Sequence, residues 1–337
     1  MDNLFKIRVL TAAVNAMKAP GMVIYDRLFR PREHLVPSSL MALDIRAGSE
    51  KILKVISPKA PATVTEKTNR KVITMQAPRL AQKRAISASD LDDIRKLGDQ
   101  IRTEALSDRI RQELEDMNNE VNRTLEFWAA GAIKGKIYDA DLSTVLVDYA
   151  LAADTHDLTL TGTDLWTNAS SKPVEKLRSF KKTIEDDAGT TITGWLAFCG
   201  SGVMDALLGH TKVRELLVYN RGQAMAEQGR VETLAEVELV EYNGSFLDDS
   251  GVRRRFVDEG EMVLLGLCQD LVDTPYAPVV DFKAAGGVGN VDETGRGVMF
   301  FSKSWETEDP SVRWIKVESR PLPVLQRPGA VVRATVV

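Results

Sequence analysis

The sequence predicts an α+β fold in which a β-rich first part precedes one very long helix and a mixed second half. Three observations lead to this prediction. The 337 residues suffice for roughly two domains. The 13 prolines are unevenly placed, with six in the first 78 residues, only Pro173 between residues 79 and 274, and six in residues 275–328. Finally, an apolar repeat of three or four residues continues for about forty residues without a proline.

The composition is that of a soluble globular chain and excludes several classes of protein. Hydrophobic residues make up 44% and charged residues 27%. The net charge of −4 argues against a protein whose main function is to bind the phosphate backbone of nucleic acids. No stretch of about 18 apolar residues is present, so we expect no membrane span. The apolar residues near the start are interrupted by charged and polar ones, so we expect no secretory signal.

The first zone, through residue 78, is predicted to be an extended arm and a hairpin outside the packed core. Pro58, Pro61 and Pro78 punctuate short apolar runs at residues 52–56 and 72–75, and strands so rich in proline lie at edges or project. Residues 45–86 hold ten Lys or Arg and two Glu, a local charge of +8. A projecting basic β-arm explains this charge, and so does a solvated basic loop.

The second zone is predicted to contain a helix of about 41 residues within 87–130, which would be ~60 Å long. Ser87 and Asp90 resemble a capping box at its start, and Gly131 and Gly135 are expected to end it. The helix carries a single apolar stripe on a charged surface, so it must lie across a sheet or pair as a coiled coil. Residues 87–130 carry a local charge of −5.

Shorter elements follow the long helix. A helix is expected from Pro173 to a stop at Gly189, because proline suits the first helical turn and glycine the position after the last. A second helix is expected over 203–208, with a continuation towards residue 219, and a mobile loop over 220–230. Strands are expected at residues 145–151, 158–160, 195–198, 237–242, 261–267, 312–319 and 330–337.

Each sequence motif that could indicate catalysis or cofactor binding lacks a residue that the motif requires. The run Gly286–Gly289 has Asp292 where a dinucleotide fingerprint needs its third glycine. Cys199 stands where a nucleophile elbow needs its first glycine, so Gly200–Gly202 is expected to be a turn. The acidic pairs 186–187 and 248–249 neighbour glycines, as at helix ends and turns. We therefore predict no enzyme activity and no cofactor.

Metal binding and disulfides are not expected either. The two cysteines, Cys199 and Cys268, are predicted to be reduced. His156 and His210 have no partner at metal-ligand spacing, so each is expected to be a surface histidine or a satisfied one.

The opposite local charges suggest a contact between identical subunits. If the basic arm of one copy lies over the acidic helix of a neighbour, their complementary charges would set the register between copies. The candidate interface residues are Lys67, Arg70, Lys71, Arg79, Lys83 and Arg84 on the basic side and Glu104, Asp108, Glu113 and Asp116 on the acidic side.

The order of several short segments resembles a known family. These segments are YDRLF at 25–29, VISPKAP at 55–61, PRL at 78–80 leading to Arg84, LTLTGTDLW at 158–166, SWETEDP at 304–310 and SRPLP at 319–323. Together they resemble the lambda-type major capsid proteins of tailed bacteriophages, the phage capsid protein E family. No single segment is diagnostic, but the resemblance covers essentially the whole chain.

The resemblance implies the Hong Kong 97-type capsid fold. In that fold an N-terminal arm and an extended β-hairpin loop project from a peripheral domain that contains a long spine helix, and a mixed α/β axial domain completes the subunit. Mapped by position, the arm would be residues 1–42, the extended loop 43–86, the peripheral domain 87–170 with return strands at 299–337, and the axial domain 171–298.

The resemblance also implies a function. Copies would form the hexamers and pentamers of an icosahedral shell around a double-stranded DNA genome, without sequence-specific DNA binding. An uncleaved chain, a separate scaffold protein, a portal and, in some relatives, a decoration or cement protein are expected, with assembly in the bacterial host cytoplasm and a final location in the virion capsid. Lysines and asparagines abound, but no pair stands out for a covalent cross-link.

Two other interpretations stay open on the sequence alone. An encapsulin-like nanocompartment shell shares the fold and would hold a cargo peptide in an interior apolar pocket. An α/β enzyme with an unrecognised site would be a monomer with a deep polar cleft.

Overall fold

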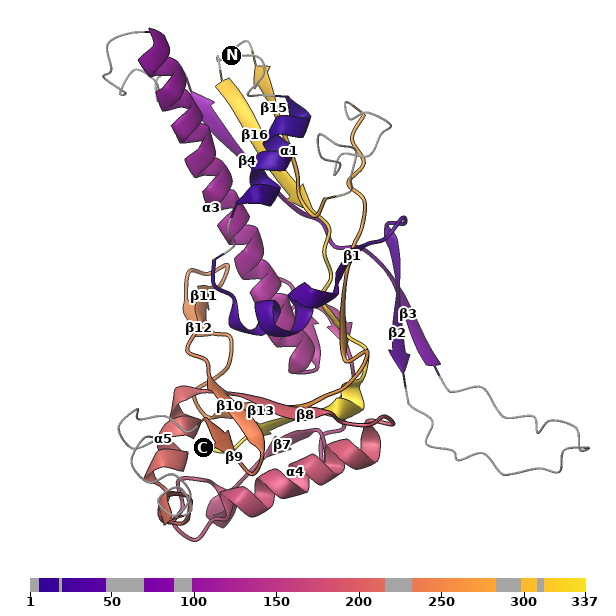
Figure 1. Ribbon diagram of the computed structural model, residues 1–337, viewed down its shortest axis with the longest axis vertical. Helices are drawn as coiled ribbons and strands as arrows, with labels where there is room; N and C mark the ends of the chain where they lie inside the picture. Colours follow the sequence, from indigo (N-terminus) through magenta and orange to yellow (C-terminus); the bar gives the residue numbers. More distant parts are fainter. Residues whose placement is uncertain are drawn as a thin grey trace, which may run out of the picture. The chain divides into compact units, whose positions relative to one another are not determined.

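The computed structural model describes residues 6–17, 20–46, 70–87, 99–215, 232–282, 298–307 and 312–337 (Figure 1). The chain divides into two compact units that alternate along the sequence. The first consists of Met1–Ala42, Thr74–Trp128 and Thr274–Pro323, and the second of Leu43–Ile73, Ala129–Asp273 and Val324–Val337. Both units combine helices with strands, so the fold is of the mixed α+β class.

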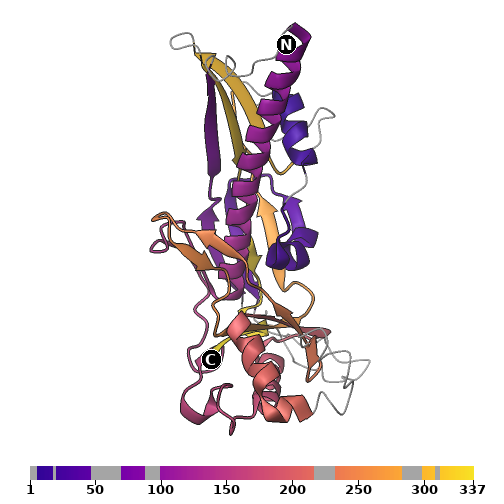
Figure 2. The same ribbon diagram turned by 90° about the vertical axis from the view of Figure 1, so that its left-hand side faces the viewer.

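The first unit contains a three-stranded antiparallel sheet with helices on one face. The strand order is β15-β16-β4, and the pairing of β16 with β4 runs without a bulge from Val312↔Ser87 to Ser319↔Leu80. The elements of this unit are α1 (Ile7–Ala16), η1 (Tyr25–Phe29), η2 (Arg30–Arg32), β1 (Glu33–Leu35), β4 (Leu80–Ser87), most of α3 (Asp99–Ile133), β15 (Phe301–Thr307) and β16 (Val312–Ser319), with β1 parallel to β14 (Val272–Tyr276). Figures 1 and 2 show α1 and α3 running along this sheet.

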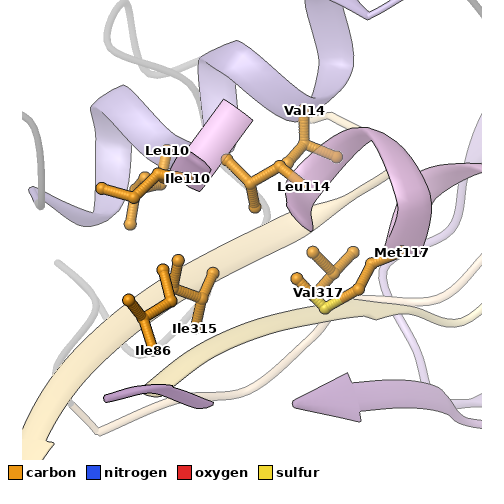
Figure 3. Packing of buried hydrophobic residues seen from close by; sticks show 8 residues of the cluster. All are labelled: Leu10, Val14, Ile86, Ile110, Leu114, Met117, Ile315 and Val317. Carbon is orange, nitrogen blue, oxygen red and sulfur yellow. The ribbon is translucent and has the colours of Figure 1, made fainter. Parts of the chain in front are cut away.

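The core of the first unit lies between this sheet and the two helices. Side chains from α1, α3, β4 and β16 meet there, and Figure 3 shows those of the helices facing those of the strands. The buried cluster consists of Leu10, Val14, Ile86, Ile110, Leu114, Met117, Ile315 and Val317. Because strand side chains alternate between faces, burial of Ile86, Ile315 and Val317 directs their sequence neighbours to the opposite face of the sheet.

Helix α1 also covers part of one edge of the sheet. The Thr11 hydroxyl donates to the carbonyl of Ser302 at 3.1 Å and accepts from the Ser302 N–H at 3.1 Å. The Asn15 amide does the same for Phe300, at 2.9 and 3.1 Å. Residues four apart on the helix thus satisfy backbone groups two apart at Phe300, just before β15, and at Ser302, near its start, which blocks this end of the edge as a template for another strand.

Truncating the core of the first unit should destabilise it strongly. We expect Leu114→Ala to lower the free energy of unfolding by about 3 kcal/mol, because the side chain is buried and the cavity cannot fully collapse. Urea unfolding of the unassembled chain measures the loss. Leu247→Ala, at an exposed leucine, is the control and should cost less than about 0.5 kcal/mol. Equal losses in the two variants would contradict the assigned packing.

The second unit is built on a six-stranded sheet of order β7-β18-β13-β8-β10-β9. Helix α4 packs against β13 and β18, with Leu177, Phe180 and Ile184 buried. The elements are β5 (Lys136–Tyr138), β6 (Val145–Asp148), β7 (Asp157–Thr159), η3 (Gly162–Asp164), α4 (Pro173–Asp187), β8 (Gly194–Cys199), α5 (Ser201–Gly209), β9 (Thr233–Leu234), β10 (Val237–Glu241), β11 (Ser245–Leu247), β12 (Arg253–Arg255), β13 (Glu261–Leu267), β17 (Val324–Leu325), η5 (Pro328–Ala330) and β18 (Val331–Thr335). Strand β17 pairs with the first residues of β14.

A two-stranded ribbon completes the described elements. It consists of β2 (Leu40–Arg46) and β3 (Arg70–Gln76), and both strands belong partly to each unit by sequence. Residues 47–69 between them lie outside the described residues, as does the expected apolar run at 52–56.

The predicted elements with clear periodicity are confirmed. Helix α4 begins at Pro173 and is followed by Gly189 with φ +59°, and Gly135 with φ +93° follows the end of α3. The strands expected at 195–198, 237–242, 261–267, 312–319 and 330–337 are all present within one or two residues of their expected bounds. The helix expected at 203–208 is α5, and residues 211–215 are again helical. The loop expected at 220–230 lies outside the described residues.

Two local predictions are wrong. The long helix does not stop at Gly131 but continues to Ile133. Ser87 is the last residue of β4, where it pairs with Val312, and the expected helix start after it, at residues 88–98, lies outside the described residues. The first zone is not extended throughout, because α1 is a helix whose Leu10 and Val14 lie in the core.

Candidate functional site

The candidate interface residues fall into three groups in the structure. Lys67 lies outside the described residues, and so do the side chains of Arg70, Lys71 and Glu104. The six remaining candidates lie in the first unit, where β4 and the loop before it carry the cations and α3 carries the carboxylates: Arg79, Lys83, Arg84, Asp108, Glu113 and Asp116.

Arg84 is paired with the long helix of its own chain. Its side chain lies on the helix-facing side of β4, where its guanidinium donates to Glu113 at 2.8 Å and to Glu120 at 2.7 Å and reaches Asp116 at 3.4 Å. Glu113 also pairs with Arg109 at 2.8 Å. The hydrogen bond to Glu113, with the nearby carboxylates, raises the pKa of Arg84. This contact fixes β4 against α3 and uses part of the helix's negative charge within the subunit.

Arg79 belongs to a second cluster, around a buried carboxylate on β16. Its guanidinium donates two hydrogen bonds to the Glu318 carboxylate, at 2.7 and 2.9 Å. These hydrogen bonds raise the pKa of Arg79. Lys316 also pairs with Glu318, and Arg320 lies 3.7 Å from it. Bidentate pairing fixes the geometry of the turn into β4 as well as adding energy.

Lys83 lies on the face of the sheet away from the helices. Its ammonium stands 4.7 Å from the centre of the Trp314 ring, and the Trp305 and Trp314 rings stack with centroids 6.4 Å apart. Strand register aligns Lys303, Lys316 and Lys83 in one row across β15, β16 and β4. Among the described residues, this row of lysines beside two stacked tryptophans lies only on the face of the sheet away from α1 and α3.

His156 and Cys199, two of the residues that the sequence singled out, are buried within the fold. Within the described ranges of the chain, no group of three or more His, Cys, Asp or Glu side chains could hold a metal ion. His156 is a satisfied core histidine, with Nδ1 2.7 Å from the Val331 carbonyl and Nε2 2.9 Å from Asp187. The Cys199 thiol is buried, which raises its pKa to about 12 and makes it a poor nucleophile.

The turn expected at Gly200–Gly202 is wrong for two of its three residues: Gly200 is the extended N-cap residue, and Ser201 and Gly202 form the start of α5. A Cβ at Gly200 would lie 2.0 Å from the carbonyl oxygen of Asp258, so the close approach of two backbone segments requires glycine there. The Gly286–Gly289 run lies outside the described residues. Among the helices described, none is both long enough and apolar enough to cross a bilayer.

Comparison with known families decides the identity of the fold. The family model for phage major capsid protein E matches residues 6–336. The chain belongs to the phage major capsid protein E family. No curated protein gave a significant match. The family is one of shell proteins, so the capsid interpretation is favoured over the nanocompartment and over the enzyme.

Solved structures show the same fold at low sequence identity. A protein assigned as a prophage capsid protein of E. coli CFT073 is 16% identical, with 98% of this chain and 99% of that chain covered and a TM-score of 0.64. A phage-related protein of Bordetella bronchiseptica RB50 is 13% identical over 97% and 95%, with a TM-score of 0.57. The capsid of cyanophage P-SCSP1u is 10% identical over 90% and 85%, with a TM-score of 0.51. The chain thus has a mixed α+β fold similar to that of Hong Kong 97-type phage capsid proteins.

Several residues of this capsid protein's charged surface were not among the sequence candidates. Glu120 completes the Arg84 cluster, Glu318 anchors Arg79, and Trp305 and Trp314 flank the lysine row. The alternation of Arg, Trp, Ile, Lys, Val and Glu along residues 313–318 is a signal that separates the two faces of β16. It does not reveal which strands lie beside it.

Acidification should destabilise the capsid subunit. Burial alone would raise the pKa values of Glu261 and Glu318, but Lys134 and Arg333 beside Glu261, and Arg79 and Lys316 beside Glu318, together lower them. A lowered folded-state pKa contributes stability that is complete above the unfolded value, near 4.3, and is lost as the pH falls through the folded value.

We therefore expect the contribution of these two carboxylates to be constant from pH 7 to about 5 and to fall below about pH 4.5. Urea midpoints of the unassembled chain between pH 7 and pH 3 measure it. Glu318→Gln removes one titrating group, so its midpoint should change less steeply with pH. A wild-type midpoint unchanged at pH 3.5 would contradict the assignment.

Proposed function

We propose that copies of this chain assemble into the hexamers and pentamers of an icosahedral shell that encloses double-stranded DNA. The family match over residues 6–336 is the observation that carries the proposal. The fold, with its likeness to a cyanophage capsid structure over nine-tenths of the chain, supports it. The subunit's role in this proposal is structural, and its sequence-independent contact with DNA agrees with the net charge of −4.

The proposal assigns a role to each part of the chain. Helix α3 is the spine helix of a peripheral domain formed by residues 87–170 and 299–337, and residues 171–298 form the axial domain. Residues 1–42 are the N-terminal arm, and the β2–β3 ribbon is the base of an extended loop at 43–86. Two strands depart from a simple division by sequence, because β7 from residues 87–170 and β18 from the return segment lie in the same sheet as β13, β8, β10 and β9.

The shell also needs partners that come from other genes. A separate scaffold protein, a portal and a decoration or cement protein are the proposed ones, with assembly in the bacterial host cytoplasm. Negative-stain microscopy of the expressed chain, alone and with its scaffold, tests the proposal. Closed shells or hexameric rings are the expected result. A chain that stays monomeric at every salt concentration would overturn it.

Charges on the extended loop are proposed to set the contact between neighbouring copies. The loop cations Lys67, Arg70 and Lys71 would face carboxylates on a neighbour's α3. Asp116, with a side chain 63% exposed, remains accessible even though Arg84 reaches it. We expect the triple variant Lys67→Glu, Arg70→Glu, Lys71→Glu to form no normal particles, because like charges would then meet across the contact. Microscopy and sedimentation measure assembly.

Lys182→Glu provides a control, because it reverses an exposed cation on α4, outside both the loop and α3. A compensating variant sharpens the test. Adding Glu104→Lys and Asp108→Lys to the triple variant should restore some particles if these carboxylates are the partners. Normal particles from the triple variant alone would overturn the proposed contact.

A further inference from the structure

The second face of the β15–β16–β4 sheet carries an ordered set of side chains that lie outside the cluster under α1 and α3. The first face is filled by the cluster under α1 and α3 (Figure 3). Strand register places three rows across the second face: Phe301, Glu318 and Ala81; Lys303, Lys316 and Lys83; Trp305, Trp314 and Ala85. We call these nine residues the lysine–tryptophan face.

Cations stand over aromatic rings throughout this face. Lys83 lies 4.7 Å from the Trp314 ring centre, Lys303 lies 5.7 Å from that of Trp305, and Lys316 lies 6.0 Å from that of Phe301. The two indoles stack at 16° between planes. Such contacts hold long side chains in place, so the face is pre-organised before any partner arrives.

The part of the face over β4 is open. Ala81, Lys83 and Ala85 are exposed, whereas Phe301 and Glu318 at the other end are buried. The two alanines are small, so Lys83 and the partly exposed Trp314 rise above a shallow apolar floor. Tryptophan is one of the residue types enriched at the energetic centres of protein–protein contacts.

The charges of the face indicate what would cover it. With Arg79 and Arg320 at its rim, five cations surround two carboxylates, Glu318 and Asp281. The face therefore carries an excess of three positive charges on a chain whose net charge is −4, so the rest of each copy is acidic. Glu318 and Asp281 lie among the lysines, which suits a polypeptide of mixed charge better than a uniform polyanion such as DNA.

We propose that the lysine–tryptophan face is a contact between subunits, which binds an acidic segment with apolar side chains from a second copy of this chain. The inference rests on the proposed shell function and adds a surface and a partner chemistry to it. Lys83 and Trp314 form the centre of the contact.

Lysine acetylation followed by mass spectrometry tests the proposal. Dissociated chain and assembled particles are treated with the same acetylating reagent, and the labelling rate of Lys83 is compared with that of Lys182, an exposed lysine on α4. We expect assembly to slow labelling of Lys83 by about tenfold or more, since a buried contact centre excludes the reagent. Equal rates for Lys83 in particles and in free chain would overturn the inference.

Two variants give a second measurement, which needs no finished particle. Lys83→Glu reverses the charge, and Ala85→Arg keeps it positive while filling the floor beside Trp314. Both should weaken self-association, measured by sedimentation velocity over a concentration series, by about tenfold, with unchanged melting temperatures. Lys182→Glu is the control with the same change of charge. Unchanged self-association in both variants would overturn the inference.

The outcomes separate the two proposals. Wild-type chain that forms no oligomer would overturn the shell function. Wild-type shells that leave Lys83 reactive overturn only this contact. A third arm adds a short DNA duplex to the dissociated chain. Protection of Lys83 by the duplex, but not by assembly, would overturn the subunit contact and identify the face as a DNA contact.

Discussion

Glu261→Leu should lower the free energy of unfolding of the subunit by about 3–5 kcal/mol. Glu261 is 2% exposed and lies 2.5 Å from both the Lys134 ammonium and the Arg333 guanidinium. It also accepts the Asp258 N–H at 3.1 Å. Removing the carboxylate leaves two cations and a backbone donor without their main partner in the second unit. Urea unfolding followed by circular dichroism measures the loss.

A comparison with an exposed ion pair separates the effect of burial from the effect of losing a negative charge. Glu236 pairs with Lys181 at 2.9 Å, but its side chain is 86% exposed, so Glu236→Leu should cost less than about 1 kcal/mol. Adding Lys134→Met to Glu261→Leu should recover part of the loss, because it removes a cation that the first change left unpaired. A Glu261→Leu loss no larger than that of the exposed pair would contradict the buried assignment.

Much of the fold follows from local pattern in the sequence. Pro173 and Gly189 bracket α4, and the apolar run at 261–267 becomes β13, a strand buried along nearly its whole length. These elements are predictable because each one's own residues carry the start, the period and the stop. The family resemblance, read from ordered short segments, is confirmed by the match over residues 6–336.

Elements that depend on distant partners were not predictable. β15 has polar residues at alternate positions; β16 pairs with it, and Thr11 of α1 hydrogen-bonds the backbone of Ser302 near its start. Ser87 pairs with Val312 as the last residue of β4. The contacts of Thr11 with Ser302 and of Ser87 with Val312 join residues more than 200 apart in the sequence, and no local propensity encodes them.

The charged surface shows the same limit. Counting charges along the chain correctly separates a basic segment from an acidic helix, but a count does not say which copy supplies the partner. Arg84 forms ion pairs with Glu113, Asp116 and Glu120 of its own chain, because α3 packs on the face of the sheet to which the Arg84 side chain points. The tryptophans beside Lys83 come from β15 and β16, whose register with β4 is a property of the folded chain.

Glu126→Leu should lower the free energy of unfolding by about 3 kcal/mol and loosen the segment around η1 first. The Glu126 side chain is buried on α3 and accepts the N–H groups of Ile24 at 2.9 Å and Tyr25 at 2.8 Å. These donors belong to the first turn of a helical segment, where no carbonyl of the helix itself can accept them. Limited trypsin digestion after Arg27 measures the local loosening, and urea unfolding measures the total loss.

The cause can be assigned because leucine and glutamate have similar helix propensities, so the substitution leaves α3 itself intact. Glu126→Gln keeps one acceptor oxygen and should lose less than Glu126→Leu. Glu115→Leu, on the same helix but half exposed and 3.9 Å from Arg111, should leave both stability and trypsin sensitivity near those of the wild type. If Glu126→Leu unfolds at a lower urea concentration but cuts at Arg27 no faster than Glu115→Leu, the carboxylate stabilises α3 rather than the segment it caps, and the assignment is wrong.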